Sequence, residues 1–300
     1  MFQKASREEG LVGASLVFLA AAAFSAKAVM IKLAYRYDVD AITLLALRMA
    51  FSLPFFAVMA AYGEARTESR VSRGDAAKIM FLGLGGFYLS ALLDFMGLLY
   101  VSAGFERLIL FLYPTIVVLI SAVWFGQRIT KTVAASLALS YVGVLLALSN
   151  EARFYGKDAL YGAALVFGCA FTYAVYLVGA DRVIPRAGTL RFTGYAMTVS
   201  CAAVLTQYGL TRGGGIFRLP APVYRLGLLM ALVSTVLPVL LMSEGMRRIG
   251  AGKTAIISSV GPVFTILTAY VFLGEKITAL QMAGTALIIA GVVSVKESRA

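Results

Sequence analysis

Two stretches of sequence decide the fold, and they are copies of one another. The first is AGFERLILFLYPTIVVLISAVWFGQRITKTVAASLALSYVGV at residues 103–144, and the second is AGKTAIISSVGPVFTILTAYVFLGEKITALQMAGTALIIAGV at residues 251–292. They align without a gap at an offset of 148, and 14 of their 42 positions are identical, where a shared apolar composition would give roughly four. The stretch GASLVF at 13–18 likewise recurs as GAALVF at 162–167. The chain is therefore an internal duplication.

The composition places both copies in lipid. Of the 300 residues, 60% are hydrophobic and 14% are charged, whereas soluble domains contain about 25% charged residues. Backbone N–H and C=O groups find no water inside a bilayer, so a spanning chain must be helical or form a closed barrel. The apolar runs do not alternate in polarity, which favours helices. We predict an all-α integral membrane protein.

Ten apolar segments have the length of a transmembrane helix. They lie at residues 11–34, 42–62, 77–100, 103–125, 132–149, 158–180, 190–210, 223–246, 251–273 and 279–295. The duplication divides them into two five-helix repeats, residues 1–150 and 151–300, which together form one transport domain. Cys169 and Cys201 lie within these segments, where cysteine serves as an ordinary packing residue.

An odd number of spans in each repeat inverts the second repeat relative to the first. Two similar halves of opposite orientation can exchange conformations, so that a central site opens to one side of the membrane and then to the other. Such alternating access is the mechanism of a secondary transporter. A duplicated bundle also suits a channel or a scaffold, and a monomer is compatible with the pattern.

The basic residues predict how the chain is oriented. If the N-terminus is inside, sixteen Lys and Arg residues belong to cytoplasmic segments and nine to the opposite side, as the retention of positive charge on the cytoplasmic side requires. We predict a multi-pass protein of the inner (plasma) membrane with both termini cytoplasmic. Residues 11–31 are too long for the apolar core of a signal peptide and should be retained. The net charge of +12 then reflects topology and contact with anionic lipid, and no nucleic-acid partner is expected.

Four segments carry a resemblance to a known family. They are AFSAKAVMIKLAY at 23–35, LALRMA at 45–50, YVSAGFERLILFLYPTIVVLISAVWFGQRIT at 100–130 and GAGKTAIISSVGPVFTILTAYVFLGEKIT at 250–278. Together they resemble the drug/metabolite transporter (DMT) superfamily, and within it the EamA-like branch of ten-helix carriers. The resemblance covers nearly the whole chain and implies a secondary transporter that exports small metabolites.

Within this superfamily the chain most resembles the YddG-type exporters of amino acids, including aromatic ones. Drugs, purines, nucleotide sugars and other metabolites remain alternative substrates. The family pattern of a mid-helix proline, then glycine and an acid at the helix end, is complete in the second repeat as Pro262, Gly274 and Glu275. The first repeat has Gln127 in place of the acid. Lys27 is a second departure, because the family has a small or polar residue at this position of the first span.

Three charged residues lie within the predicted spans and are candidates for substrate binding. Lys27, Arg48 and Asp94 each cost about 2.5–3.5 kcal/mol near a helix centre, so they should face the protein interior. At about 1.5 Å per residue all three reach a similar depth in the outer third of the membrane. We therefore expect a charged cluster. The alternative is that Lys27 and Arg48 extend to the outer interface and Asp94 pairs with either.

A binding pocket also needs apolar walls and a few placed polar groups. We expect walls and hydrogen-bond donors from the aromatic and serine residues of the spans, although span aromatics also serve in packing and at the lipid interface. These candidates are Tyr88, Tyr100, Tyr113, Trp124, Tyr173, Tyr176, Ser243, Ser258 and Ser259. Together with the charged cluster they could accept the ammonium, the carboxylate and the side chain of an amino acid.

Prolines within the spans are candidate hinges. Proline lacks an N–H and clashes with the preceding turn, which weakens the helix at that point. Pro114 and Pro262 are repeat partners, and Pro54 and Pro238 lie in the second and eighth spans. Static kinks are the alternative interpretation.

The sequence argues against an enzyme. It contains no histidine and only two separate cysteines, which excludes Ser/His and Cys/His nucleophiles and HExxH metal sites. We expect no catalytic residue, metal or cofactor. The nucleotide-binding pattern GxxxxGK[ST] does not occur either. Transport would therefore be facilitated, or coupled to an ion or a second solute.

Overall fold

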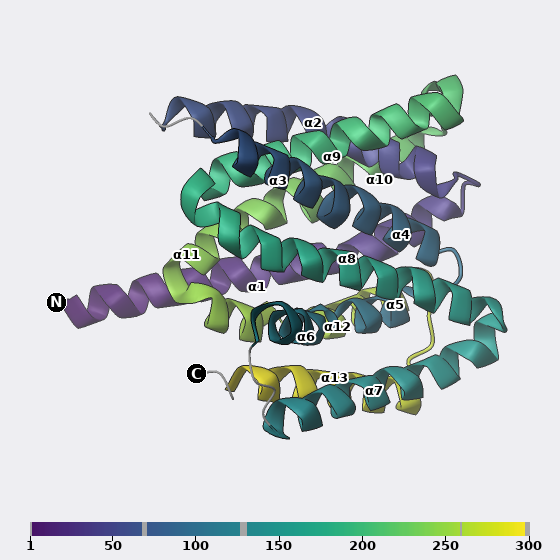
Figure 1. Ribbon diagram of the computed structural model, residues 1–300. Helices are drawn as coiled ribbons and strands as arrows, with labels where there is room; N and C mark the ends of the chain where they lie inside the picture. The colour runs from purple at the N-terminus through teal and green to yellow at the C-terminus, as the bar shows by residue number, and fades with distance from the viewer. Residues whose placement is uncertain (1, 68–70, 127–130, 259, 298–300) are drawn as a thin grey trace.

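The computed structural model describes residues 2–67, 71–126, 131–258 and 260–297, and these form helices joined by short turns (Figure 1). The elements of the first half are α1 (Phe2–Tyr35), α2 (Ala41–Ala65), α3 (Arg73–Gly83), η1 (Leu84–Leu89), α4 (Ser90–Gly97), α5 (Ala103–Leu110), α6 (Tyr113–Phe125) and α7 (Lys131–Tyr155). Those of the second half are α8 (Asp158–Ala187), α9 (Thr189–Thr211), η2 (Gly213–Arg218), α10 (Ala221–Ala231), η3 (Leu232–Val236), α11 (Leu237–Ser258), α12 (Gly261–Leu273) and α13 (Ala279–Glu297).

The all-α membrane fold predicted from the sequence is confirmed. Within the described residues, six helical segments are long and apolar enough to cross a membrane, and two further apolar helices are shorter. The predicted third span is formed by α3, η1 and α4, and the fourth by α5 and α6. The predicted division at residues 150 and 151 lies within α7, and it remains an interpretation of the duplication.

The duplication is visible in the boundaries of the helices. At the offset of 148, α3 corresponds to α10 and α6 to α12 at both their first and last residues. Both α6 and α12 end at a glycine in the left-handed region, Gly126 with φ 64° and Gly274 with φ 71°. This conformation ends a helix cheaply only for a residue without a side chain.

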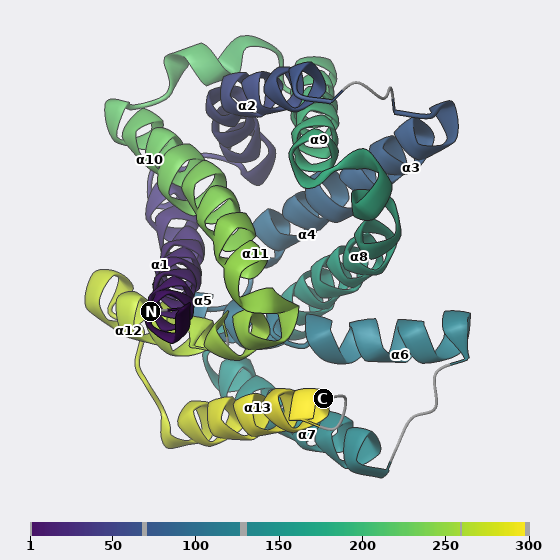
Figure 2. The ribbon, with the colours of Figure 1, turned by 90° about the vertical axis from the view of Figure 1, so that its left-hand side faces the viewer.

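The packing follows a twofold arrangement of the two halves. Helix α1 packs on α11 and α12, and its counterpart α8 packs on α4 and α6. Helix α2 packs on its own counterpart α9, and α7 packs on its counterpart α13. These two self-related pairs lie at opposite ends of the bundle in Figures 1 and 2. Pairing of an element with its own copy is what a twofold relation produces, in agreement with inverted repeats.

Glycines allow the closest helix contacts in both halves. A Cβ on Gly245 of α11 would lie 3.0 Å from the carbonyl oxygen of Gly13 on α1. The repeat counterparts make the same crossing, because a Cβ on Gly97 of α4 would lie 3.2 Å from the carbonyl oxygen of Gly162 on α8. Small residues at such crossings let helix backbones approach within lipid, where no hydrophobic effect drives helices together.

Two wide helical turns occur at equivalent positions. The π-helical segments η1 and η3 both begin 11 residues after the start of α3 and α10. In η3 the hydroxyls of Ser234 and Thr235 both donate to the carbonyl oxygen of Met230, at 3.0 and 2.9 Å. Side-chain donors of this kind satisfy backbone groups that an irregular helix leaves open in lipid.

One predicted helix boundary is wrong. The eighth and ninth spans were expected to separate between residues 246 and 251, but α11 runs through this region to Ser258. In the first half the corresponding break precedes α5, where the Ser102 hydroxyl accepts a hydrogen bond from the N–H of Phe105 and caps the helix. The second half has Gly250 at that position. Glycine supplies no side-chain oxygen to cap a new helix start, and in this half the helix runs on without a break.

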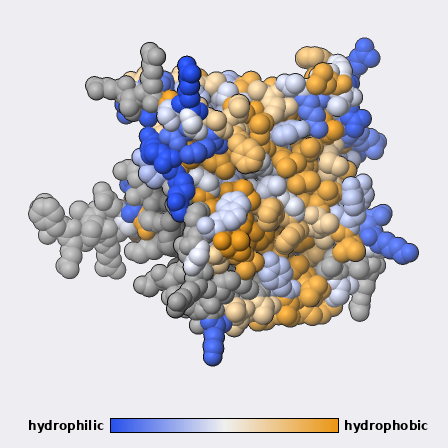
Figure 3. Space-filling model, viewed as in Figure 1, coloured by the Kyte–Doolittle hydropathy of each residue, from blue (hydrophilic) through white to orange (hydrophobic). Residues whose placement is uncertain are grey.

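The surface has the polarity of a membrane protein. Figure 3 shows a broad hydrophobic face with hydrophilic residues gathered toward its two sides. Large apolar side chains such as Phe81, Leu99, Phe167 and Phe171 are exposed on the bundle. The first residues of α1 and the last of α13 lie on the same side (Figures 1 and 2), as an even number of spans requires. Which side faces the cytoplasm stays a prediction.

Thiol labelling tests the predicted orientation. Thr67 and Gly214 are exposed at opposite ends of predicted spans, whereas the native Cys169 and Cys201 are buried. In spheroplasts an impermeant maleimide should label Gly214→Cys and spare Thr67→Cys, and in inside-out vesicles the pattern should reverse. Labelling of Thr67→Cys in spheroplasts would contradict cytoplasmic termini.

The glycine crossing between α4 and α8 should be sensitive to a single methyl group. A Cβ on Gly162 would lie 2.7 Å from the Cβ of Tyr100, and such overpacking costs about 1–3 kcal/mol. Gly162→Ala should therefore lower the thermal unfolding temperature of the purified protein. Gly85→Ala is the control, because nothing lies within 4 Å of a Cβ there. Equal stability of the two variants would show that this contact is not tight.

Candidate functional site

A buried ion cluster joins three helices of the first half. The Nζ atom of Lys27 on α1 donates to Oδ2 of Asp94 on α4 at 2.6 Å and lies 3.5 Å from Oε1 of Glu106 on α5. The side chains of Asp94 and Glu106 are 2% and 0% exposed. The predicted pairing of Lys27 with Asp94 is thus present in the structure, and a second acid joins it.

Neighbouring hydrogen bonds hold α1 in register with its partners. The Ser25 hydroxyl donates to the carbonyl oxygen of Gly261 on α12 at 3.0 Å, and the Thr265 hydroxyl donates to the carbonyl oxygen of Ser25 at 3.2 Å. The Tyr35 hydroxyl donates to the carbonyl oxygen of Phe95, next to Asp94. These hydrogen bonds lie on both sides of Lys27 along α1. They fix the position of the α1 backbone, which directs the Lys27 ammonium group toward the two acids.

Glu106 was not recognised from the sequence. It lies in the first turn of α5, near the predicted outer end of the fourth span, whereas the sequence places Asp94 deep within the third span. In the structure α5 is covered by its neighbours, and Ala103, Phe105 and Glu106 are fully buried. The sequence does contain a signal for the local position of Glu106. It follows the capping residue Ser102 in the first turn of α5, where acidic residues are favoured.

Glu275 stabilises the same helix from the second half. Its two carboxylate oxygens accept the N–H groups of Ala103 and Gly104 at 2.9 and 3.3 Å. Glu275, the acid of the family pattern, therefore caps the N-terminus of α5 in the first half by accepting its free N–H groups. The counterpart, Gln127, lies outside the described residues.

Arg48 is buried beside the cluster and does not extend to the interface. Its guanidinium carbon lies 5.2 Å from the ring centre of Phe95, a cation–π geometry. Among the described residues no acid lies within 4 Å of it, and its Nε has no hydrogen-bond partner. Arg48 is 7% exposed, and the Lys27 side chain is 16% exposed and directed toward two buried acids. This arrangement favours the charged cluster over the alternative in which Lys27 and Arg48 extend to the outer interface.

Three of the predicted tyrosines form an aromatic row. The rings of Tyr113 and Tyr173 meet edge to face at 5.3 Å, and those of Tyr173 and Tyr176 stack at 5.7 Å. Two residues that the sequence did not single out complete the row, since Tyr176 lies 4.6 Å from Phe87 and 5.9 Å from Phe192.

The packing of α4 on α8 links the ion cluster to the aromatic row. Cys169, Tyr173 and Tyr176 recur at a spacing that places them on one face of α8. Ser90, one turn before Asp94, contacts the Cys169 sulfur at 3.1 Å. This contact lies between the charged and the aromatic ends. At the offset of 149, Tyr176 is also the repeat counterpart of Lys27, so equivalent positions in the two halves carry an ammonium and an aromatic ring.

The other predicted wall residues lie elsewhere. Tyr88 packs against the main core, and Tyr100 meets the exposed Tyr161 edge to face at 5.1 Å. Trp124 is 61% exposed on the surface of α6, so its assignment to a cavity wall is wrong. The remaining candidates cannot be placed by their side chains: Ser259 lies outside the described residues, as do the side chains of Ser243 and Ser258.

The paired prolines follow breaks in the helices and do not lie inside them. Pro114 and Pro262 occupy the first turns of α6 and α12, where proline is tolerated because no N–H is needed. Pro238 is the second residue of α11, directly after η3, and Pro54 lies inside α2. Three of the four candidates therefore mark places where a span changes its helical geometry.

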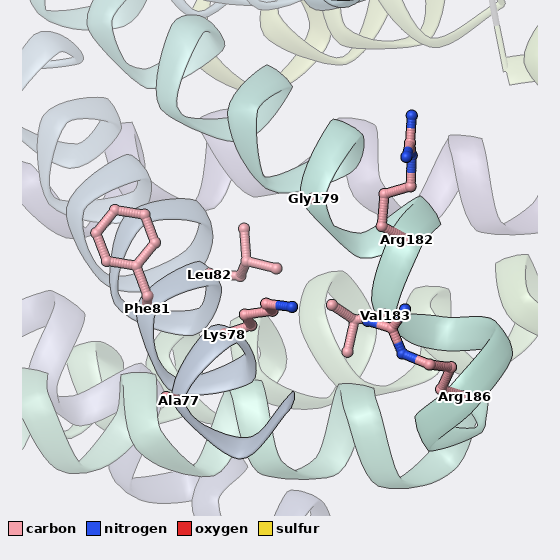
Figure 4. A pocket seen from close by; sticks show the side chains of 8 residues that line it. All are labelled: Ala77, Lys78, Phe81, Leu82, Gly179, Arg182, Val183 and Arg186. Atoms are coloured by element: carbon pink, nitrogen blue, oxygen red, sulfur yellow. The ribbon is translucent and has the colours of Figure 1, made fainter. Parts of the chain in front are cut away.

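A separate groove of about 410 Å³ opens between α3 and α8 (Figure 4). It is lined by Ala77, Lys78, Phe81, Leu82, Gly179, Arg182, Val183 and Arg186. Asp75 lies beside it and accepts two hydrogen bonds from Arg186, at 2.8 and 3.2 Å. None of the predicted binding residues lines this groove, so it is distinct from the ion cluster.

Comparison with known proteins places both halves in one family. The EamA-like transporter family matches residues 11–149 and again residues 160–296. The uncharacterized transporter YcbK of Bacillus subtilis is 31% identical over 281 residues, which cover 92% of this chain and 90% of that protein. A solved crystal structure has the same fold, with a TM-score of 0.64, 21% identity and 96% coverage of both chains.

The names of two relatives from Salmonella typhimurium indicate a membrane or a substrate class for those proteins. The uncharacterized inner membrane transporter YicL is 25% identical over 74% of this chain and 73% of its own length. A probable amino-acid metabolite efflux pump is 25% identical over 63% of this chain and 66% of its own length.

Removing charges from the cluster should show how its members depend on one another. Lys27→Met leaves two buried acids without their cation, and breaking a buried ion pair costs about 3–5 kcal/mol. Asp94→Asn should cost less, because Glu106 still faces Lys27, and Asp94→Asn should partly restore the stability of Lys27→Met. Thermal unfolding of the purified variants measures this. Arg248→Met, which removes an exposed pair with Glu244, is the control. If Lys27→Met unfolds at the wild-type temperature, the pairing of Asp94 and Glu106 with Lys27 does not stabilise the fold.

Proposed function

The chain belongs to the EamA-like transporter family, and on this basis we propose that it exports amino acids, including aromatic ones, across the inner membrane by alternating access. Members of this family are membrane transporters and not enzymes. The relatives named as an inner membrane transporter and as an amino-acid metabolite efflux pump support the membrane and the substrate class.

The observation that carries the proposal is the α4–α8 interface with one charged end and one aromatic end. Lys27 and the acids Asp94 and Glu106 can pair with the carboxylate and the ammonium of an amino acid. The row formed by Tyr113, Tyr173 and Tyr176 offers ring faces and edges to its side chain. Asp94 and Phe87 are seven residues apart, about 10 Å along the helix axis. We also assign Arg48, which is buried beside the ion cluster, to the charged end.

The twofold arrangement supplies a route for alternating access. At the glycine crossings of α1 with α11 and of α4 with α8 the helix backbones approach closely, and we assign the relative motion of the helices to these two equivalent crossings. We assign the hinges to the helix breaks at Pro114 and Pro262 and to the wide turn before Pro238. We also assign a hinge to Pro54, which lies inside the continuous helix α2 that packs on α9.

Counterflow in liposomes tests the substrate class. Purified protein should exchange labelled phenylalanine for unlabelled amino acids in a saturable way and should not exchange a nucleoside or a sugar phosphate. Tyr173→Ala should raise the half-saturation concentration for phenylalanine about 2- to 12-fold, because an aromatic contact contributes about 0.5–1.5 kcal/mol. Alanine exchange should change less.

Tyr161→Ala is the matched control, since its ring meets Tyr100 outside the aromatic row. Exchange of purines or drugs without amino acids would replace the proposed substrate class. Unsaturable flux of all small solutes would indicate a channel. Equal effects of Tyr173→Ala on phenylalanine and alanine would remove the aromatic row from the binding site.

A further inference from the structure

The ion cluster holds more acceptors than donors. Two carboxyl groups face one ammonium, and three of their four oxygens, Oδ1 of Asp94 and both of Glu106, accept no hydrogen bond from any described residue. With both acids ionised, the three groups would carry a net charge of −1, although the acid side chains are only 2% and 0% exposed. Such a charge is costly unless it is paired or neutralised.

No other charged group lies close enough to supply the missing partner. Arg48 from α2 faces the ring of Phe95, and Arg107, the neighbour of Glu106 on α5, lies against Gly261 of α12. Among the described residues, neither guanidinium is within 4 Å of either acid. The titratable groups from the remaining packed elements are the Tyr35 hydroxyl, which donates to the carbonyl of Phe95, and the Cys169 thiol, which contacts Ser90. Neither of them donates to Glu106.

We propose that Asp94 and Glu106 form a proton-binding site, and that the entry of one proton drives the export of one substrate molecule. This inference rests on the proposed export function. A single proton on the pair turns one oxygen into a donor, neutralises the net charge and leaves Lys27 paired with the remaining carboxylate.

The coupling follows from competition for the same oxygens. A substrate ammonium that enters from the cytoplasm pairs with the two acids and displaces the shared proton into the water on that side. When the site opens outward and the substrate leaves, a proton from outside returns to the pair. Each cycle therefore moves one substrate out and one proton in. Lys27 remains charged throughout and pairs with the substrate carboxylate while the substrate is bound.

Infrared spectroscopy detects the proton without a need for transport. Proteoliposomes at neutral pH should show the carbonyl stretching band of a protonated carboxyl group, and this band should disappear on alkaline titration. Glu106→Gln and Asp94→Asn should each remove or shift it. Glu64→Gln is the matched control, because this carboxylate is 41% exposed and paired with Arg191, and the band should remain. The absence of a protonated carboxyl band in the folded wild-type protein would overturn the proposal.

Flux measurements separate coupling from binding. With phenylalanine as the probe, a pH gradient should drive net export by the wild type, and Glu106→Gln should reduce this net flux about 5- to 150-fold, the range of ordinary coupling energies. Counterflow, which needs no gradient, should slow in Glu106→Gln because the substrate ammonium loses one of its two carboxylates, but its rate should no longer depend on pH. The Glu64→Gln control should keep wild-type counterflow and wild-type net flux. Net flux by Glu106→Gln that still follows the pH gradient would overturn the coupling role. Wild-type liposomes without counterflow would refute the amino-acid substrate, while the infrared band would still decide the proton site.

Discussion

The need to neutralise one lysine within the membrane fixes the first half of the molecule. Lys27 cannot remain alone at its depth in α1, because an unpaired ammonium there costs several kcal/mol. Its two acids come from different helices, Asp94 from α4 and Glu106 from α5. One cation therefore determines how three helices approach, and the bonds of Ser25 and Tyr35 keep α1 at the required height. The aromatic row gains its position from the same constraint, since α8 packs along the face of α4 that carries Asp94.

Much of this architecture could be predicted from the sequence, because helices of the first half have counterparts in the second half that indicate the same boundaries. The offset of 148 reproduces the ends of α6 and α12, and the depth estimate brings Lys27 and Asp94 together. The same reasoning failed for Glu106 because depth along a span does not report burial. A residue near the end of a short helix such as α5 can be enclosed by its neighbours. Trp124 is the reverse case, where an aromatic residue on a span faces outward.

The two halves share a fold but differ in chemistry. Lys27 has Tyr176 as its counterpart, and the capping residue Ser102 has Gly250. The first difference exchanges an ammonium for a ring, and the second occurs where a broken helix of the first half corresponds to a continuous one in the second. Glu275 reaches across to α5 and supplies a cap to the half in which the helix is broken. The two halves therefore share one arrangement of helices, and the residues that differ between them form the charged end and the aromatic end.

The wide turns η1 and η3 have a consequence for any projection of these spans onto a helical wheel. Each extra residue in a wide turn shifts the phase of the following residues by about 100° relative to an uninterrupted α-helix. A wheel drawn from Ile79 through Asp94 would therefore assign Asp94 to a side of the helix that it does not occupy. The hydrophobic faces of α3 and α4, and equally of α10 and α11, must be drawn as separate wheels before their neighbours are inferred.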